Sequence, residues 1–132
     1  NILAWQRLAQ HTGARLVVIP VNHNGHIDYD MIHRCITPRA KLVAVCHVSN
    51  VTGMQMPVAD LVARAREVGA AVLVDGAQMV PHHQIDVHAL EVDFYVFSAH
   101  KMLGPTGIGA LFVHKRWHNQ LEPYLLGGGM VD

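Results

Sequence analysis

Short apolar runs recur along the chain and are separated by polar or turn-rich stretches. Most of these runs are continuous rather than alternating, which is typical of strands in a parallel sheet that is covered on both faces. The clearest example is KLVAVC at 41–46. The expected strands are residues 14–20, 41–46, 70–75, 93–97 and 108–113.

Several of the intervening stretches carry apolar residues at helical spacing. The clearest has Pro57 in its first turn and Gly69 just after its last, the residues that favour a helix start and a helix stop. Asp28 and Asp86 can cap two shorter segments. The expected helices are residues 1–11, 29–36, 57–68 and 115–121, with a single turn at 87–90.

Strands and helices in alternation predict an α/β fold with a parallel, doubly wound sheet. One connection differs from the others, because only about ten residues and no helix join 93–97 to 108–113. That is shorter than a parallel crossover needs. We therefore expect a mostly parallel sheet in which 108–113 is the one antiparallel strand.

The composition is that of a globular domain and excludes some partners. The chain has 132 residues, enough for one domain with a core, and it is 51% hydrophobic and 15% charged. Ten basic and ten acidic residues cancel, so neither nucleic acid nor an anionic membrane is an expected partner. The apolar runs are of strand length and no signal-peptide pattern opens the sequence, so we expect neither a membrane span nor a leader.

Cysteine and histidine usage gives no sign of a disulfide framework or a metal site. The two cysteines, Cys35 and Cys46, suit free thiols in a reducing cytoplasm. Cys35 falls on an expected helix and Cys46 in an expected buried strand, where thiols are usually inert. The eleven histidines are scattered and form no ligand motif, so no metal is expected.

Two charged side chains stand where a parallel sheet binds ligands. Asp75 ends the expected strand 70–75, and Lys101 follows the expected strand 93–97. Ligands of open α/β sheets bind at the carboxyl ends of the strands. A lysine and an acid in one crevice suit pyridoxal phosphate, because the lysine forms a Schiff base and the acid partners the pyridinium nitrogen. The plainer alternatives are an acid that caps a turn and a lysine whose stem covers a strand end.

Three motifs around these residues resemble a known family. DGAQ at 75–78, FSAHKMLGPTGIG at 97–109 and HVSNVTG at 47–53 are similar to motifs of fold-type I pyridoxal-phosphate enzymes of the class V aminotransferase group. HVSNVTG narrows the resemblance to SUF-type cysteine desulfurases and selenocysteine lyases. The resemblance implies that residues 1–132 are part of a cofactor-binding large domain.

The resemblance also implies a role for each polar residue of the motifs. Lys101 would carry the cofactor, Asp75 would face the ring nitrogen, and Gln78 and Asn50 would face its phenolic oxygen. Ser98 and His100 would contact the phosphate. Taken alone, each of these residues is as well explained as a polar side chain in a turn or at a strand end.

The activity that the resemblance implies is removal of sulfur from L-cysteine as an enzyme-bound persulfide, which leaves L-alanine. It implies a cytoplasmic homodimer, a sulfur-acceptor protein as partner and a role in iron–sulfur cluster assembly. Alternatives are a selenocysteine lyase acting on L-selenocysteine, a kynureninase-like or aminotransferase member of class V, or a catalytically silent structural remnant.

Some of the family's functional groups fall outside this chain. The resemblance places the ring-stacking histidine before Asn1, and the nucleophilic cysteine and the substrate-carboxylate arginine after Asp132. The glycines at 127–129 match a family loop near the dimer interface. We therefore expect residues 1–132 to be an internal piece of a longer enzyme and to be inactive alone.

Overall fold

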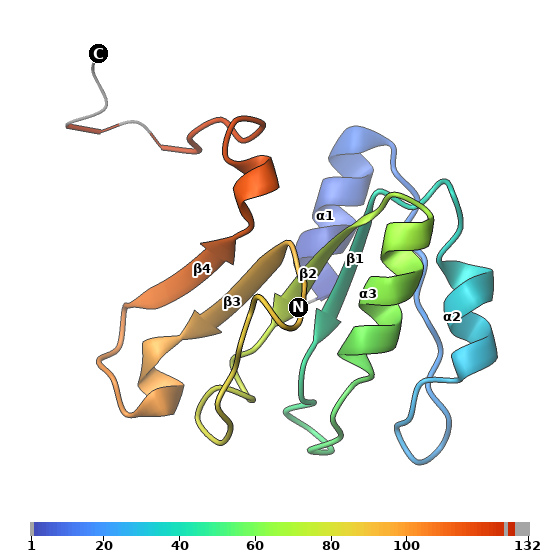
Figure 1. Ribbon diagram of the computed structural model, residues 1–132, viewed down its shortest axis with the longest axis horizontal. Helices are drawn as coiled ribbons and strands as arrows, with labels where there is room; N and C mark the ends of the chain where they lie inside the picture. Colours follow the sequence, from blue (N-terminus) through green and yellow to red (C-terminus); the bar gives the residue numbers. More distant parts are fainter. Residues whose placement is uncertain (1, 126, 129–132) are drawn as a thin grey trace.

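The computed structural model describes residues 2–125 and 127–128, which form a layered α/β unit (Figure 1). Expected features at Asn1 and Gly129 lie outside the described residues. The α-helices are α1 (Ile2–Thr12), α2 (Tyr29–Cys35) and α3 (Val58–Glu67). The strands are β1 (Leu42–Cys46), β2 (Ala71–Asp75), β3 (Phe94–Ser98) and β4 (Gly109–Val113), and the 3-10 helices are η1 (Ala99–Met102) and η2 (Lys115–Trp117).

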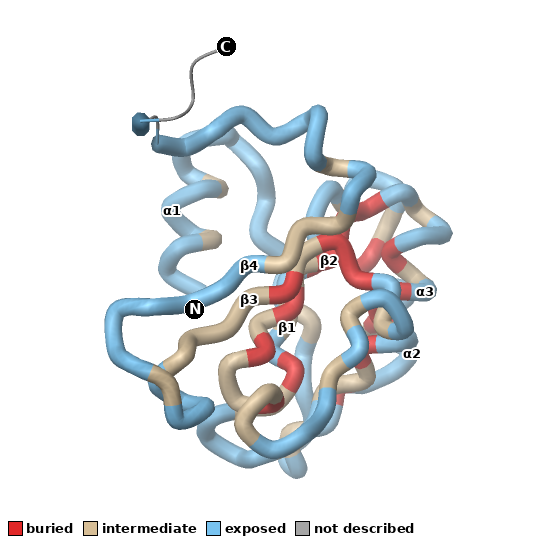
Figure 2. Tube along the Cα trace, turned by 60° about the vertical axis from the view of Figure 1, so that its left-hand side comes forward, coloured by how far each residue is buried: buried red, intermediate tan, exposed pale blue. Residues whose placement is uncertain are grey.

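The four strands form one mixed sheet in the order β1-β2-β3-β4. β1, β2 and β3 pair in parallel, and β4 pairs antiparallel with β3. The prediction of a mostly parallel sheet with one antiparallel strand is therefore confirmed. Helices α2 and α3 lie on one side of the sheet and α1 on the other, as both views show (Figures 1 and 2).

The core lies between the sheet and α3, which packs on β1 and β2. Figure 2 shows buried positions in β1, β2 and β3 and on the side of α2 and α3, whereas α1 has none. Leu61 and Ala65 of α3 are fully buried there, as is Val74 of β2. Burial of these apolar side chains is the main force that holds the helix on the sheet.

The expectation that the first strand is covered on both faces is wrong. Burial alternates along β1: Val43 is buried, whereas Leu42, Ala44 and Cys46 are exposed. The reason is that the second face has little cover, because no residue of α1 is buried. Cys46 is thus exposed rather than buried as expected.

The expected strand 14–20 is also wrong for the described residues. The segment runs without helix or strand assignment, and its neighbourhood has only an isolated antiparallel bridge between Val21 and Ile27. Leu16, Val17 and Val18 are exposed. An apolar run favours an extended backbone, but a strand also needs a neighbour to hydrogen-bond with, and this segment pairs with no described strand.

Helix boundaries follow the predicted signals in the middle of the chain. Pro57 precedes the first residue of α3, and Gly69, just beyond its end, has a φ of +75° that suits glycine. The Asp28 side chain caps α2 by accepting from Asp30 N at 3.0 Å. The Asp86 carboxylate caps the turn at 87–90 by accepting from the backbone N of His88 and Ala89.

The expected helix at 115–121 is shorter than predicted. It is the 3-10 helix η2, followed by turns. Its bonds span three residues, from Trp117 N to His114 O and from His118 N to Lys115 O. Pro123 disfavours helical backbone at Glu122, which helps to explain why the helix does not continue.

Asp93, just before β3, joins β2 to η2. Asp93 is 4% exposed, and its carboxylate accepts from Val72 N at 2.8 Å, from Trp117 Nε1 at 2.7 Å and from Arg116 Nε. Burial raises the pKa of this carboxyl, but the hydrogen bonds from Arg116, Trp117 and Val72 outweigh burial and hold the pKa below its ordinary value.

The Asp93→Asn variant of the whole protein is expected to lose about 2 kcal/mol of unfolding free energy at pH 7, because it loses a charged acceptor. The folded pKa of Asp93 lies below the unfolded value of about 3.9, so its contribution is present above that pH. The difference from wild type should therefore shrink as the pH falls below about 4. Urea unfolding at pH 7 and at lower pH measures it. Asp60→Asn, at an exposed site in α3, is the control, and an equal loss in both variants would contradict the assignment.

Candidate functional site

The carboxyl ends of β1, β2 and β3 meet at one edge of the sheet. In the parallel register Cys46 lies beside Asp75, and Asp75 lies beside Val96. Three connections leave the strands at this edge: the loop after β1, the turn after β2, and η1 after β3. The topology therefore gathers the three sequence motifs at the edge where open α/β sheets bind ligands.

Asp75 is the last residue of β2 and is half-buried. Its Oδ1 accepts from Ala77 N at 3.0 Å, so the turn-capping role considered from the sequence is present. Met79 N and Val80 N both donate to Gly76 O and close the turn tightly. Capping does not exclude a ligand role, because the same bond fixes the direction of the carboxylate at the sheet edge.

The predicted cofactor lysine lies in η1. Ser98 ends β3 and precedes η1, and it is half-buried, whereas His100 and Lys101 are exposed. η1 is anchored at both ends by backbone bonds, from Ala99 N to Ile108 O and from Gly104 N to Ala99 O. The Lys101 amine therefore stands on an anchored turn and is open to a ligand.

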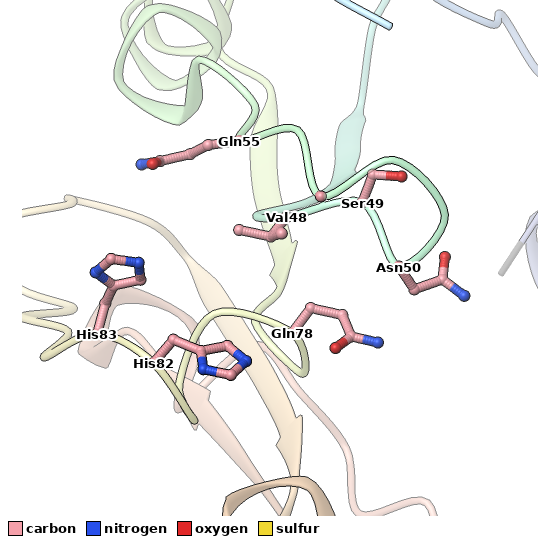
Figure 3. Close-up of a pocket in the computed structure, with 8 residues that line it drawn as sticks. Val48, Ser49, Asn50, Gln55, Gln78, His82 and His83 are labelled. Atoms are coloured by element: carbon pink, nitrogen blue, oxygen red, sulfur yellow. The ribbon is translucent and has the colours of Figure 1, made fainter.

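Asn50 and Gln78 come together in one hollow of about 410 Å³ (Figure 3). The side chain of Ser49 accepts from Val51 N and Thr52 N at 3.2 Å, which shapes the loop tip that carries Asn50. In Figure 3 the two amide side chains lie toward one end of the hollow, and Gln55 and His83 toward the other.

The hollow brings together only part of the predicted set. Four other predicted residues do not line it, although the structure describes them all: Asp75, Ser98, His100 and Lys101. It adds His82 and His83, which the sequence did not single out among its eleven histidines. Their one sequence signal is their place just after DGAQ, on the connection that leaves the carboxyl end of β2.

Cys46 is the last residue of β1 and lies beside Asp75 at this edge of the sheet. The pKa of its thiol is raised, which favours the neutral form. Cys46 is exposed as a residue, but partial burial of its thiol raises the thiol pKa, and the negative charge of Asp75 raises it further. A raised pKa lowers the thiolate fraction at neutral pH, and the thiolate is the nucleophile. Cys46 is thus poorly suited to attack a substrate. The sequence also predicted an inert thiol, but on the ground that Cys46 would be buried in a strand.

Across residues 2–125 and 127–128, histidine, cysteine and acidic side chains form no group of three or more that could hold a metal ion. Within the same ranges, no helix has the length and apolar character needed to cross a bilayer.

Comparisons with known proteins agree with the motifs. Residues 1–132 match the aminotransferase class-V family over their whole length. The chain is 47% identical over 131 residues to a cysteine desulfurase of Cronobacter sakazakii, an alignment that covers 99% of this chain and 32% of the relative. The chain thus spans about a third of the length of the curated relatives it matches.

Solved structures give the same picture. The apo cysteine desulfurase of Thermococcus onnurineus superposes with a TM-score of 0.94 at 41% identity, covering 99% of this chain and 33% of that one. The cysteine desulfurase CsdA of Escherichia coli, in its S-sulfonic acid form, also gives a TM-score of 0.94, at 42% identity. That match covers 100% of this chain and 33% of CsdA.

Proposed function

The chain belongs to the aminotransferase class-V family, and on that basis we propose that the whole protein is a pyridoxal-phosphate-dependent cysteine desulfurase. It removes sulfur from L-cysteine as an enzyme-bound persulfide and releases L-alanine. The observation that carries the proposal is the meeting of three motifs at one sheet edge, in a chain 47% identical to a cysteine desulfurase.

The residues at this edge fit pyridoxal phosphate by their chemistry. The cofactor needs an amine, an anion near its ring nitrogen, donors to its ring oxygen and donors to its phosphate. Lys101 supplies the amine and Asp75 the anion, and both follow parallel strands that end at this edge. When bound, the cofactor supplies an electrophilic carbon and a ring that accepts electrons.

Each residue then has a task that follows from its position. Lys101 is exposed on an anchored turn, so its amine can bond to the cofactor and later move a proton. Asp75 holds a negative charge that favours a protonated ring nitrogen. Gln78 and Asn50 line one hollow, where their amides can donate to the ring oxygen.

Ser98 and His100 would contact the phosphate of the cofactor. They flank Ala99, where β3 ends and η1 begins. A hydroxyl and an imidazole can both donate to phosphate oxygens. The same family membership supports a homodimer, a sulfur-acceptor protein as partner, a cytoplasmic location and a role in iron–sulfur cluster assembly as parts of this proposal.

The whole protein, purified with pyridoxal phosphate, is expected to convert L-cysteine to L-alanine with one sulfur released for each alanine under reducing conditions. The physical reason is that cleavage of one carbon–sulfur bond yields both products. Alanine by chromatography and sulfide by colour reaction measure them. L-Selenocysteine and L-kynurenine, supplied separately, test the alternatives, and turnover of either without turnover of L-cysteine would contradict the proposed substrate.

A further inference from the structure

A buried side-chain pair crosses beneath the Asp75 turn. His47 follows β1 and Tyr95 lies in β3, so β2 separates them in the sheet (Figure 1). They are 3% and 1% exposed, and His47 Nδ1 lies 3.0 Å from Tyr95 Oη. Their rings meet edge to face, with centroids 5.9 Å apart. The contact therefore links the residue after the end of β1 to the second residue of β3, across the strand between them.

The Tyr95 ring lies directly against Gly76. A Cβ placed on Gly76 would come within 2.1 Å of Tyr95 Cε1 and 2.3 Å of its Oη. Only glycine allows this approach, since no side chain tolerates such overlap. The ring and hydroxyl of Tyr95 thus pack directly against the peptide that joins Asp75 to Gly76.

The segments on either side of β2 also hold that peptide by its backbone. His47 N donates to Asp75 O at 2.8 Å, and Gly76 N donates to Val96 O at 2.8 Å. The two donated bonds fix the turn from both flanking strands, and the His47–Tyr95 bond ties those strands together below it. Loss of the side-chain bond would loosen both flanks of the turn at once.

The pair is neutral at physiological pH. Burial lowers the pKa of the His47 imidazole, and nearby His83 lowers it further. Burial raises the pKa of Tyr95 to about 12, helped by the negative charge of Asp75. A neutral imidazole and a neutral phenol add no charge beside Asp75. They therefore do not weaken the electrostatic attraction between the Asp75 carboxylate and a positively charged ligand group.

We propose that His47 and Tyr95 act as a positioning pair, which holds the Asp75–Gly76 turn from below and so directs the Asp75 carboxylate toward the ring nitrogen of the cofactor. The inference rests on the proposed function, because it assigns Asp75 that partner. Both residues are buried, and neither lines the hollow that holds Asn50 and Gln78. Both act through the backbone they support. Loss of groups that orient metal ligands in a similar way typically costs about 10- to 100-fold in affinity or activity, and we expect an effect of that order here.

The test uses the whole protein and the Tyr95→Phe variant, which keeps the ring against Gly76 and removes only the hydroxyl. Its dissociation constant for pyridoxal phosphate is expected to rise about tenfold. The visible absorbance of the bound cofactor should change its dependence on pH, because the ring nitrogen loses a well-placed anion. In cofactor-free protein, amide hydrogen exchange across residues 75–78 should become faster.

Two further variants separate positioning from packing. His47→Asn keeps a hydrogen-bonding atom near Nδ1 and should restore much of the cofactor affinity that His47→Leu loses. Trp117→Phe is the matched control, because it removes a 2.7 Å bond to buried Asp93, just before β3. It should lower stability but leave cofactor affinity, absorbance and exchange at 75–78 unchanged.

The outcomes distinguish the inference from the proposed function. If Tyr95→Phe lowers stability as Trp117→Phe does, yet keeps wild-type affinity, absorbance and exchange, the pair is only structural and the inference is wrong. A wild-type protein that binds no pyridoxal phosphate would instead refute the proposed function. In that case the exchange measurement still decides whether the pair holds the turn, and unchanged exchange would overturn the inference independently. If Tyr95→Phe does not fold, His47→Asn and His47→Leu decide the same question.

Discussion

The Lys101→Ala variant of the whole protein is expected to hold no cofactor after dialysis and to lose turnover of L-cysteine by roughly 10⁴-fold or more. The amine is the group that would bond to the cofactor, and no neighbouring residue of η1 offers another primary amine. A covalent ligand replaced by a non-bonded one also loses its fixed orientation. Visible absorbance after dialysis and alanine formation are the two measurements.

The control for Lys101 is Lys115, an exposed lysine in η2. β4 runs antiparallel to β3. η2, which follows β4, therefore lies at the opposite end of the strands from η1, which follows β3. Lys115→Ala should keep both the absorbance and the activity of wild type. A Lys101→Ala protein with a dialysis-resistant visible band like that of wild type would show that the cofactor is carried elsewhere.

The Asp75→Asn variant is expected to keep some cofactor but to turn over L-cysteine at least about 100-fold more slowly, a loss on the order of 3 kcal/mol in transition-state stabilisation. Asparagine can still accept from Ala77 N, so the turn should survive. What is lost is the negative charge, and with it the protonated ring nitrogen that makes the ring a strong electron acceptor. Steady-state kinetics at saturating cofactor measures the effect.

Asp86 offers a matched control for this experiment. Its carboxylate also caps a turn, by accepting from His88 N and Ala89 N, but it lies within the connection between β2 and β3 rather than at the end of a strand, and it is exposed. Asp86→Asn should leave kcat unchanged. Near-wild-type turnover in both variants would mean that Asp75, like Asp86, is only a turn residue.

The sequence predicted the sheet well because its strands are apolar runs with clear boundaries. The short connection after β3 correctly indicated the antiparallel strand. Residues 14–20 carry the same apolar signal and yet form no strand, since apolarity predicts an extended backbone but not a hydrogen-bonding neighbour. The exposure of Cys46 was missed because a run of apolar residues does not reveal how well each face is covered.

The candidate site was predictable where it depends on topology alone. Parallel strands place Asp75 and the connection bearing Lys101 at the same edge, and this followed from the order of elements. The side-chain contacts were not predictable. His47 and Tyr95 are 48 residues apart, and their bond depends on which strand lies between them and on the missing side chain at Gly76. His82 and His83 likewise became site residues only once the hollow was seen.

The central claim is that Lys101 carries pyridoxal phosphate at the carboxyl edge of this sheet. Borohydride reduction of the whole protein with bound cofactor, followed by peptide mass spectrometry, tests it directly. The account predicts a reduced pyridoxyl-phosphate adduct on the peptide that contains Lys101, and none on the peptides that contain Lys41 or Lys115. An adduct on another lysine, or no adduct at all in protein that binds the cofactor, would contradict it.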